Sequence, residues 1–284
     1  MKDAYYSPIE LIEDLNRLSQ LGTYVFRGFS KSDEIFPIII RDRNDVANEI
    51  DYLNAFEKYG GAYFHATAPI DFMSYAQHFG IPTRLLDFSF NPFIALSFAL
   101  YSPKGFKYKY DDDKEFYYLL IANLNDNYVI SKFTFEREAV IGAHEQLDSF
   151  SEKSKIIIGC ISNNNMCDIY HIKEFNDRRS FEGKLLFIDP NKSNQRITMQ
   201  QGLFMFPYIL DKNYHQKLIE QNTRIIKIHK SLRDILIKYL DTLGYNTYRL
   251  MPDLSSVCAA ITKRIKKQNK KHDSFEAVDL WAND

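Results

Sequence analysis

Residues 74–87 read Ser74-Tyr75-Ala76-Gln77-His78-Phe79-Gly80-Ile81-Pro82-Thr83-Arg84-Leu85-Leu86-Asp87 and separate two predicted helices. The first helix is expected over residues 69–79, where it ends before a glycine. Pro82 and the short apolar residues around it then favour an extended or turning connection. Asn91-Pro92 is typical of a helix cap and a first helical position, so a second helix is expected over residues 93–100. Because this second helix has little polarity on any side, we expect it to be buried.

The residues that precede this stretch predict a helix, a strand and a further helix. Ser7-Pro8-Ile9-Glu10 combines an N-cap serine, a proline at the first helical position and a glutamate three residues after the cap. Apolar residues then recur at helical spacing up to Gly22. Residues 23–26 are β-branched or aromatic and predict a strand that carries Arg27-Gly28 at its end. A third helical pattern covers residues 45–59.

The second half of the chain predicts mainly strands. Three runs, FYYLLIANL (116–124), KIIIGCI (155–161) and KLLFID (184–189), are too apolar for edge strands with two wet faces. We also expect Gln200 to Gly202 on a strand, another strand over 223–228, and helices over 231–243 and 252–268. Without a Pro/Gly/Ser-rich linker or a repeat, residues 1–284 predict a single α+β domain, in which helices flank a mixed or split, largely buried β-sheet.

Composition excludes several classes of protein. The 284 residues include 36 Lys+Arg and 37 Asp+Glu, which leaves a formal charge of −1 and argues against nucleic-acid binding through bulk electrostatics. A hydrophobic content of 45% argues against intrinsic disorder. Cys160, Cys167 and Cys258 fit neither a disulfide scaffold nor a zinc site, so we expect reduced thiols and no metal. With neither a secretory signal nor an apolar run of about 18 residues, a cytoplasmic location away from membranes is expected.

Three segments taken together resemble the FRG domain family, which is named for an (F/Y)RG motif. They are Phe26-Arg27-Gly28, residues 74–87, and Asn91-Pro92 leading into residues 95–99. Weaker likenesses follow at Arg196 with residues 200–204 and at residues 251–254. The tripeptide alone is a weak signal, and the segment QHFGIPTRLLD carries most of the likeness. The resemblance covers about residues 20–260 and leaves a basic tail at 263–284.

The order of these segments is similar to that of the ADP-ribosyltransferase superfamily. There, an arginine on a strand is followed by a strand with Ser or Thr, then a helix, and later a strand with the catalytic Glu. The resemblance implies an ADP-ribosyltransferase-like fold and an NAD-dependent enzyme, with NAD as the substrate. It further implies a toxin or antiviral defence effector that modifies RNA, DNA or a protein and is restrained by an antitoxin or chaperone partner.

This resemblance also implies roles for individual residues. Arg27 would hold the NAD pyrophosphate, since a guanidinium makes two parallel charge-assisted hydrogen bonds, and Gly28 would lie beside it. On the ribose side Asp87 and Ser89 would order the sugar. The remaining candidates are Thr83 and Arg84 for cofactor binding, Gln200 in the position of the catalytic Glu, and His78 as a base. Phe88 and Phe90 would form an aromatic wall around the nicotinamide.

The glutamine in the third segment leaves the activity open. Gln200 can orient a ribose hydroxyl but cannot take a proton. Three explanations stay open. Asp87 could supply the negative charge in place of Glu, the target nucleophile could need no strong base, or the protein could lack this activity. A non-catalytic module that binds a nucleotide-like ligand or a partner is therefore the alternative function, and a hydrolase that uses His78 and Asp87 is a third.

Each candidate residue also has a purely structural explanation. Arg27 can be a structural arginine paired with Asp87, and His78 can cap a helix carbonyl. Thr83 and Arg84 can have the sole role of fixing the turn after Pro82. Gln200 can hydrogen-bond to backbone groups within a β-ladder. A separate basic run, residues 263–271, reads as a solvated helix end, although a local cluster of this kind can contact RNA or DNA.

Overall fold

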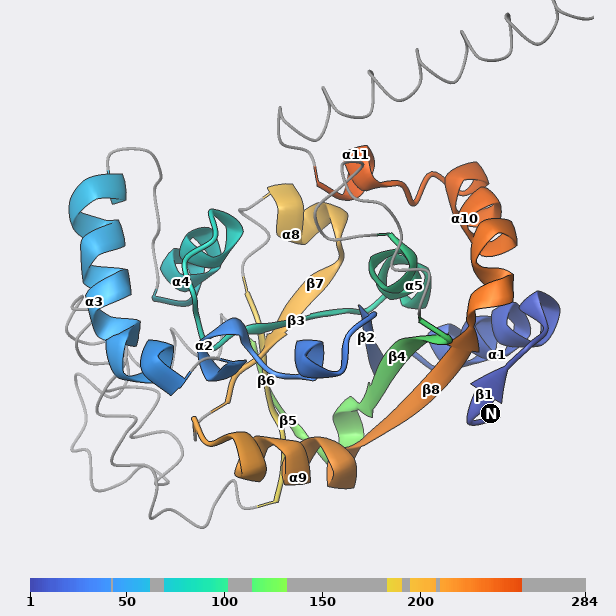
Figure 1. Ribbon diagram of the computed structural model, residues 1–284, viewed down its shortest axis with the longest axis horizontal. Coiled ribbons are helices and arrows are strands. Elements are labelled where there is room, and N and C mark those ends of the chain that lie inside the picture. Colours follow the sequence, from blue (N-terminus) through green and yellow to red (C-terminus); the bar gives the residue numbers. More distant parts are fainter. Residues whose placement is uncertain are drawn as a thin grey trace, which may run out of the picture.

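A mixed sheet of eight strands runs through the protein, with helices on both of its faces (Figure 1). The computed structural model describes residues 1–41, 43–61, 69–101, 114–131, 183–190, 195–207 and 210–251. The strand order is β1-β8-β4-β2-β3-β7-β6-β5, so the sheet joins strands from the two ends of the chain. The predicted α+β class is confirmed. The predictions for residues 155–161, 252–268 and 263–271 and for the three cysteines lie outside the described residues.

Most of the longer strands and helices follow the sequence patterns, whereas β1, β5, α2 and α9 were not predicted. The strands are β1 (Ala4–Tyr5), β2 (Tyr24–Phe29), β3 (Leu86–Ser89), β4 (Phe116–Asn123), β5 (Tyr128–Ser131), β6 (Leu186–Asp189), β7 (Gly202–Met205) and β8 (Thr223–His229). The longer helices are α1 (Pro8–Leu21), α3 (Arg43–Gly60), α4 (Pro69–His78), α5 (Pro92–Leu100), α9 (Lys212–Asn222) and α10 (Arg233–Thr242). Four shorter segments that matter below are η1 (Ser32–Ile35), α2 (Ile38–Arg41), α8 (Gln195–Met199) and α11 (Thr247–Leu250).

Each face of the sheet contributes to a different hydrophobic core. One core contains Val25 and Phe29 of β2 together with buried residues of α3 and α4. The other contains Phe26 of β2 with the apolar stripe of α1, the inner side of α5 and residues of α10. This division follows from strand geometry, because successive side chains point to opposite faces. Figure 1 shows the same division, with α3 and α4 to the left of the sheet and α1 and α10 to its right.

The helix caps test the sequence patterns at single residues. Asn91 caps α5, since its side-chain oxygen accepts hydrogen bonds from the backbone N–H groups of Phe93 at 2.9 Å and Ile94 at 3.4 Å. This cap and the burial of α5 confirm both predictions for that helix. Ser7 stands at the N-cap of α1, but its side chain makes no capping hydrogen bond. The proline and the apolar stripe therefore specify the start of α1 without the expected cap.

In the later part of the chain one sequence prediction is wrong and one helix was not predicted. Gln200 was expected on a strand, but it follows α8 in a turn, and β7 begins only at Gly202. Gln201, between them, has a positive φ of 45°, which marks the sharp change of direction there. Helix α9 carries no strong sequence signal: its apolar residues are few, and only Asp211, which accepts a hydrogen bond from the backbone of Tyr214, marks its start.

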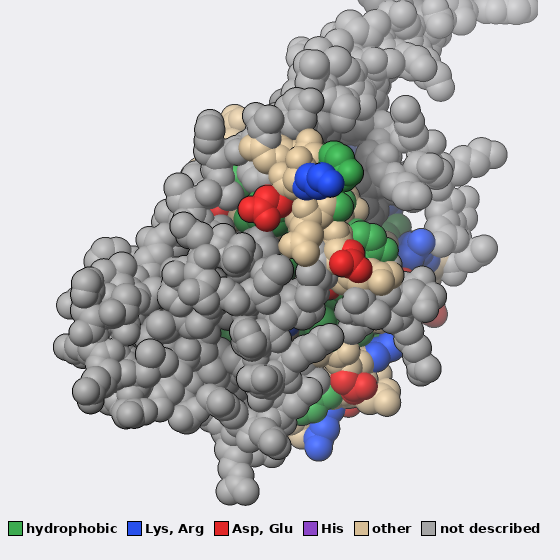
Figure 2. Space-filling model, turned by 90° about the vertical axis from the view of Figure 1, so that its left-hand side faces the viewer, with side chains coloured by type: hydrophobic (Ala, Val, Ile, Leu, Met, Phe, Trp, Pro, Cys, Tyr) green, Lys and Arg blue, Asp and Glu red, His purple; other side chains and the backbone are tan. Residues whose placement is uncertain are grey.

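The surface of the described residues mixes both charges. On the face drawn in Figure 2, the coloured Lys and Arg side chains are interspersed with Asp and Glu, as a formal net charge of −1 leads one to expect. Within the described ranges, none of the helices has the length and apolar character needed to cross a membrane.

Candidate functional site

Arg27 lies where β2 and β3 separate. These two strands pair only at Phe26 and Ser89, so the carbonyl groups that precede Ser89 on β3 meet no further backbone donor from β2. Arg27 supplies one, because its Nη1 donates to the backbone oxygen of Asp87 at 2.9 Å. On the other side, Nε and Nη2 donate to the backbone oxygen of Glu34 at 3.2 and 3.0 Å. The guanidinium thus fixes η1 against the opening between the strands.

These contacts leave part of the Arg27 guanidinium available. An arginine has five N–H donors, and the three bonds to backbone oxygens leave one N–H on each Nη. The side chain is only partly buried. The pKa of Arg27 is lowered to about 10, chiefly by desolvation and also by the charge of nearby Arg41, whereas Asp87 and Glu34 oppose the shift. The group is still a cation at neutral pH, and a bound anion would stabilise it.

The carboxylate of Asp87 is exposed and held by one neighbour. Nε2 of Gln77 donates to both carboxylate oxygens at 2.9 Å. In turn, Oε1 of Gln77 accepts a hydrogen bond from the buried hydroxyl of Thr83 at 2.5 Å. Thr83, Gln77 and Asp87 therefore form a chain that orients the carboxylate from inside the protein. Arg27 contacts the backbone of Asp87 and not its carboxylate, so the two charges do not form the close ion pair of the structural alternative.

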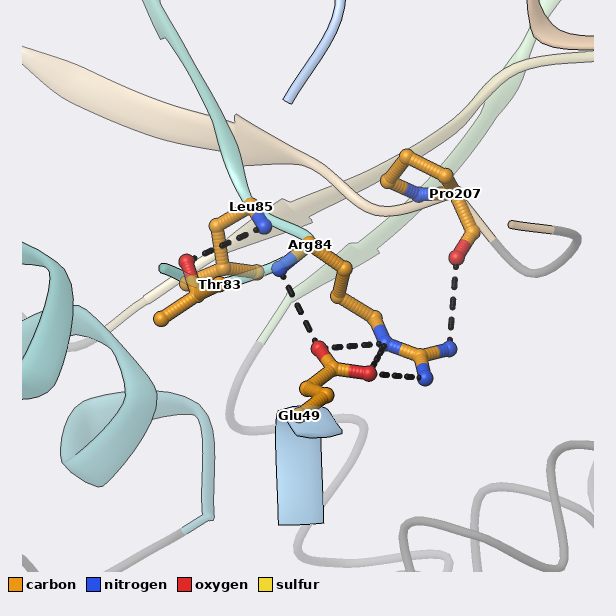
Figure 3. A network of polar contacts seen from close by, with 5 residues as sticks. All are labelled: Glu49, Thr83, Arg84, Leu85 and Pro207. Atoms are coloured by element: carbon orange, nitrogen blue, oxygen red, sulfur yellow. Dashed lines mark hydrogen bonds and ion pairs between the residues drawn. The ribbon is translucent and has the colours of Figure 1, made fainter. Parts of the chain in front are cut away.

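Arg84 is buried and forms an ion pair with a carboxylate that was not predicted from the sequence, that of Glu49. Its Nη2 lies 2.6 Å from Oε2 of Glu49 on α3, and Nε lies 3.0 Å from Oε1 (Figure 3). The backbone N–H of Arg84 also donates to Glu49, while Nη1 donates to the backbone oxygen of Pro207 at 3.4 Å. The guanidinium carbon lies 5.3 Å from the ring centre of Phe206. Arg84 thus joins three elements, and its assignment as a cofactor-binding residue stays a prediction.

Gly28 is in close contact with α5. A Cβ placed on it would lie 1.7 Å from the backbone oxygen of Ala95 and 2.7 Å from the backbone nitrogen of Ala99. Backbone atoms of a buried helix cannot move away independently, so only glycine fits here. The Arg-Gly pair therefore contributes to both faces of the sheet, with the arginine at the opening between β2 and β3 and the glycine under the helix.

Ser89 and Gln200 meet, but through the backbone of Gln200. The hydroxyl of Ser89 donates to the Gln200 carbonyl at 2.7 Å and accepts from the backbone N–H of Asn91 at 3.0 Å. The Gln200 side chain is buried, and its Nε2 donates to the backbone oxygen of Leu250 at 2.9 Å. Gln200 thus connects α8 to α11, and its amide is engaged away from the Asp87 carboxylate.

Two histidines lie near this region in different environments. His78 ends α4 and stacks on Phe79, with ring centres 4.9 Å apart and ring planes within 7°. His215 on α9 is buried, and its Nε2 lies 3.0 Å from the backbone oxygen of Ile35. Burial, and secondarily the charge of Arg27, lowers the pKa of His215 to about 4 despite this hydrogen bond. His215 is therefore neutral at physiological pH and donates to the segment that also binds Arg27.

Glu49 and His215 were not among the residues selected from the sequence, although each carries a weak sequence signal. Glu49 falls four residues before Leu53 and seven before Phe56, on the stripe of α3 that packs into the core. His215 likewise precedes buried Leu218 and Ile219 by three and four residues. A charged or titratable residue on an apolar helical stripe requires a partner, and the helical spacing alone could have suggested both.

The FRG resemblance is tested by comparison with known proteins. Residues 22–107 match the family model of the FRG domain. The match covers less than half of the chain; over those residues it supports the predicted family, and it contains the Arg27 site, Gly28, Arg84 and α5. The weaker segments at Arg196, 200–204 and 251–254 lie outside it. None of the curated proteins and none of the solved structures matches the chain, and the relation of this FRG domain to ADP-ribosyltransferases stays a prediction.

The FRG site offers a cation and a carboxylate, but no cluster of metal ligands in the part of the chain that the structure describes. Arg27 can donate two hydrogen bonds to a phosphate or pyrophosphate, and Asp87 can accept from a hydroxyl group. Thr83 positions the Asp87 carboxylate through Gln77, whereas Arg84, Ser89 and Gln200 bind partners other than Arg27 and Asp87.

Proposed function

We infer that this FRG domain binds a nucleotide with a pyrophosphate group, NAD, at Arg27 and Asp87. The observation that carries the proposal is the orientation of Arg27, whose guanidinium is fixed by two backbone oxygens and keeps one N–H on each Nη for an anion. A pre-oriented arginine loses little side-chain entropy on binding. The partly desolvated guanidinium also gains from a second negative charge beside it.

Binding without turnover is the form of this function that the geometry favours. In the predicted transferase, Gln200 stands in for the catalytic Glu, and here its side-chain amide is bound to the Leu250 backbone. One observation supports transfer of ADP-ribose as a second candidate function. The exposed carboxylate of Asp87 is held at both oxygens by Gln77, and a fixed carboxylate can stabilise the positive charge that develops on the ribose.

Thermal unfolding with ligand tests the binding. At 100 times Kd, NAD is expected to stabilise the protein by about 2.7 kcal/mol and to raise its Tm accordingly. Arg27→Lys keeps the charge and loses the paired donors, so the affinity should fall roughly tenfold or more. Arg224→Lys is the matched control, because Arg224 is a partly exposed arginine at the far edge of the sheet that contacts Asp3. If millimolar NAD and ADP-ribose leave the Tm unchanged, the proposal is wrong.

Release of nicotinamide from NAD separates the two candidate functions. A binding module raises its Tm with NAD and releases no nicotinamide, alone or in the presence of cell extract. A transferase releases nicotinamide, and Asp87→Asn should abolish that release while Arg224→Lys leaves it unchanged. Roles as a toxin or defence effector, and an antitoxin or chaperone partner, rest on the resemblance alone and stay predictions.

A further inference from the structure

Several aromatic rings and a lysine lie on the surface of the sheet where β1, β8 and β4 pair, at the opposite end of the sheet from β6 and β5. We call the group the aromatic platform; its members are Tyr6, Phe116, Tyr118, Lys227 and His229. Tyr6 directly follows β1, the next two residues belong to β4, and the last two to β8. The platform is on the same face of the sheet as Arg27, but none of its side chains is among the bonded partners of Arg27 or Asp87, and nothing in the proposed function uses it.

The strand register places these residues on one face. In the pairing of β4 with β8, Phe116 is opposite His229 and Tyr118 is opposite Lys227. The alternating residues Tyr117, Leu119, Ile226 and Ile228 point to the other face, where all four are buried in the core formed with α1, α5 and α10. The helices that contact β1 and β4, α1 and α5, therefore cover the far side of these strands (Figure 1).

The rings of Tyr6, Phe116 and His229 contact one another across the strands, whereas Tyr118 borders this group and stacks on Phe29 of β2 with ring centres 5.2 Å apart. The ring centre of Tyr6 lies 5.0 Å from that of His229 and 6.3 Å from that of Phe116, and Phe116 and His229 are 5.6 Å apart. The ammonium of Lys227 lies 5.8 Å from the Phe116 ring centre. Tyr6 is 62% exposed despite these contacts. Lys227 is also exposed, and Phe116 and His229 are half-buried. Aromatic rings that gather on an accessible sheet surface in this way are typical of a binding surface.

We propose that the aromatic platform binds single-stranded nucleic acid. Bases stack on exposed aromatic rings with little sequence preference, and lysines between the rings contact the phosphates. Cations outnumber acidic groups around the platform: Lys227 lies among its paired positions, and Lys114 and Lys230 lie at the adjoining strand ends, with the exposed Glu115 beside Phe116. The Lys114 ammonium donates to the Ser30 hydroxyl at 3.3 Å. The nearby acidic residue Asp3 is bound by Arg224 at 2.8 Å.

A second copy of this chain or another protein fits the surface less well. Protein interfaces are depleted of lysine at their centres, whereas Lys227 lies over a ring in the middle of this group. A net charge near zero removes bulk attraction for nucleic acid, so a local platform of rings and lysines would bind through stacking with a modest salt dependence.

Fluorescence anisotropy with a labelled single-stranded 12-mer, as DNA and as RNA, tests the proposal on the full chain at low salt. Tyr6→Ala should weaken binding about fivefold or more, because it removes one stacked base. Tyr6→Phe should retain the affinity, since it keeps the ring and removes only the hydroxyl. Tyr59→Ala is the matched control, because Tyr59 is an exposed tyrosine of α3, which lies across the molecule from β1 and β8 (Figure 1), and should leave Kd unchanged.

A second variant keeps the test independent of folding. Lys227→Gln should reduce the slope of log Kd against log salt by about 0.7, the value for one contact with a single strand. No binding of either 12-mer would overturn the proposal, as would equal affinities of Tyr6→Ala and Tyr59→Ala. A dimer of the wild type that Tyr6→Ala converts to a monomer in size-exclusion chromatography would also overturn it and identify a second copy as the occupant. NAD binding at Arg27 can succeed or fail independently of all these outcomes.

Discussion

At the scale of single residues, Gly28 makes the tightest requirement on the sequence. Gly28→Ala would place a Cβ 1.7 Å from the Ala95 carbonyl oxygen, and both α5 and β2 are fixed in cores. We expect a loss of about 3 kcal/mol or more in the free energy of unfolding, at the upper end for overpacked cores. Urea denaturation followed by circular dichroism measures it.

The control for Gly28 is another glycine with open space around it. Gly61→Ala meets no atom within 4 Å, and Gly61 has no positive φ, so its midpoint in urea should stay close to the wild-type value. Equal midpoints for the two variants would show that α5 does not lie on Gly28 as described.

The candidate site residues show what a single sequence reveals at this scale. Arg27 and Asp87 could be selected from their types and positions, and the structure brings them together. The partners that position them could not be read, because Glu34 acts on Arg27 through its backbone oxygen, which every residue type carries. Gln77 stood within the quoted segment, but only its spatial contact with Asp87 shows what it does.

At the scale of elements, the ion pair of Arg84 and Glu49 joins α3 to the connection before β3. Both side chains are buried, so removing one leaves an uncompensated charge in the core. Arg84→Met should therefore cost about 3–5 kcal/mol in the free energy of unfolding. Replacing both, as Arg84→Met with Glu49→Leu, should recover most of that loss, because no charge is then left unpaired.

Chemical denaturation of the two single variants and the double variant measures this coupling. The exposed pair of Lys2 and Glu10, 2.7 Å apart, provides the comparison, and its double-variant cycle should give less than about 1 kcal/mol. Strictly additive effects of Arg84→Met and Glu49→Leu would contradict the proposed coupling of the two elements.

Elements with a strong local pattern were predictable, and their pairing was not. Helix α5 follows from a cap, a proline and an apolar run, all of them local in sequence. The parallel pairing of β1 with β8 joins residues at opposite ends of the chain, and no local pattern encodes it. Gln200 was misplaced on a strand because its apolar neighbours suggest one, whereas the turn after α8 is bound through Ser89 and Leu250.

At the scale of the whole molecule, stability should depend on pH through His215, because this buried imidazole fixes α9 to η1. Its folded pKa of about 4 lies below the ordinary 6.5, so the unfolded chain binds the proton more readily. Stability is therefore full above about pH 6.5 and falls as the pH decreases toward 4. From pH 7.5 to 5.0 the expected loss from this one group is roughly 2 kcal/mol.

His215→Gln isolates this contribution, because an amide can still donate to the Ile35 oxygen but does not titrate. Urea denaturation at pH 7.5 and 5.0 should show the variant less stable than the wild type at the higher pH, with a gap that narrows by roughly 2 kcal/mol at the lower one. Carboxylates titrate alike in both proteins and cancel in the difference. If the gap between wild type and His215→Gln is the same at both pH values, the neutral buried imidazole is not what fixes α9 to the segment that binds Arg27.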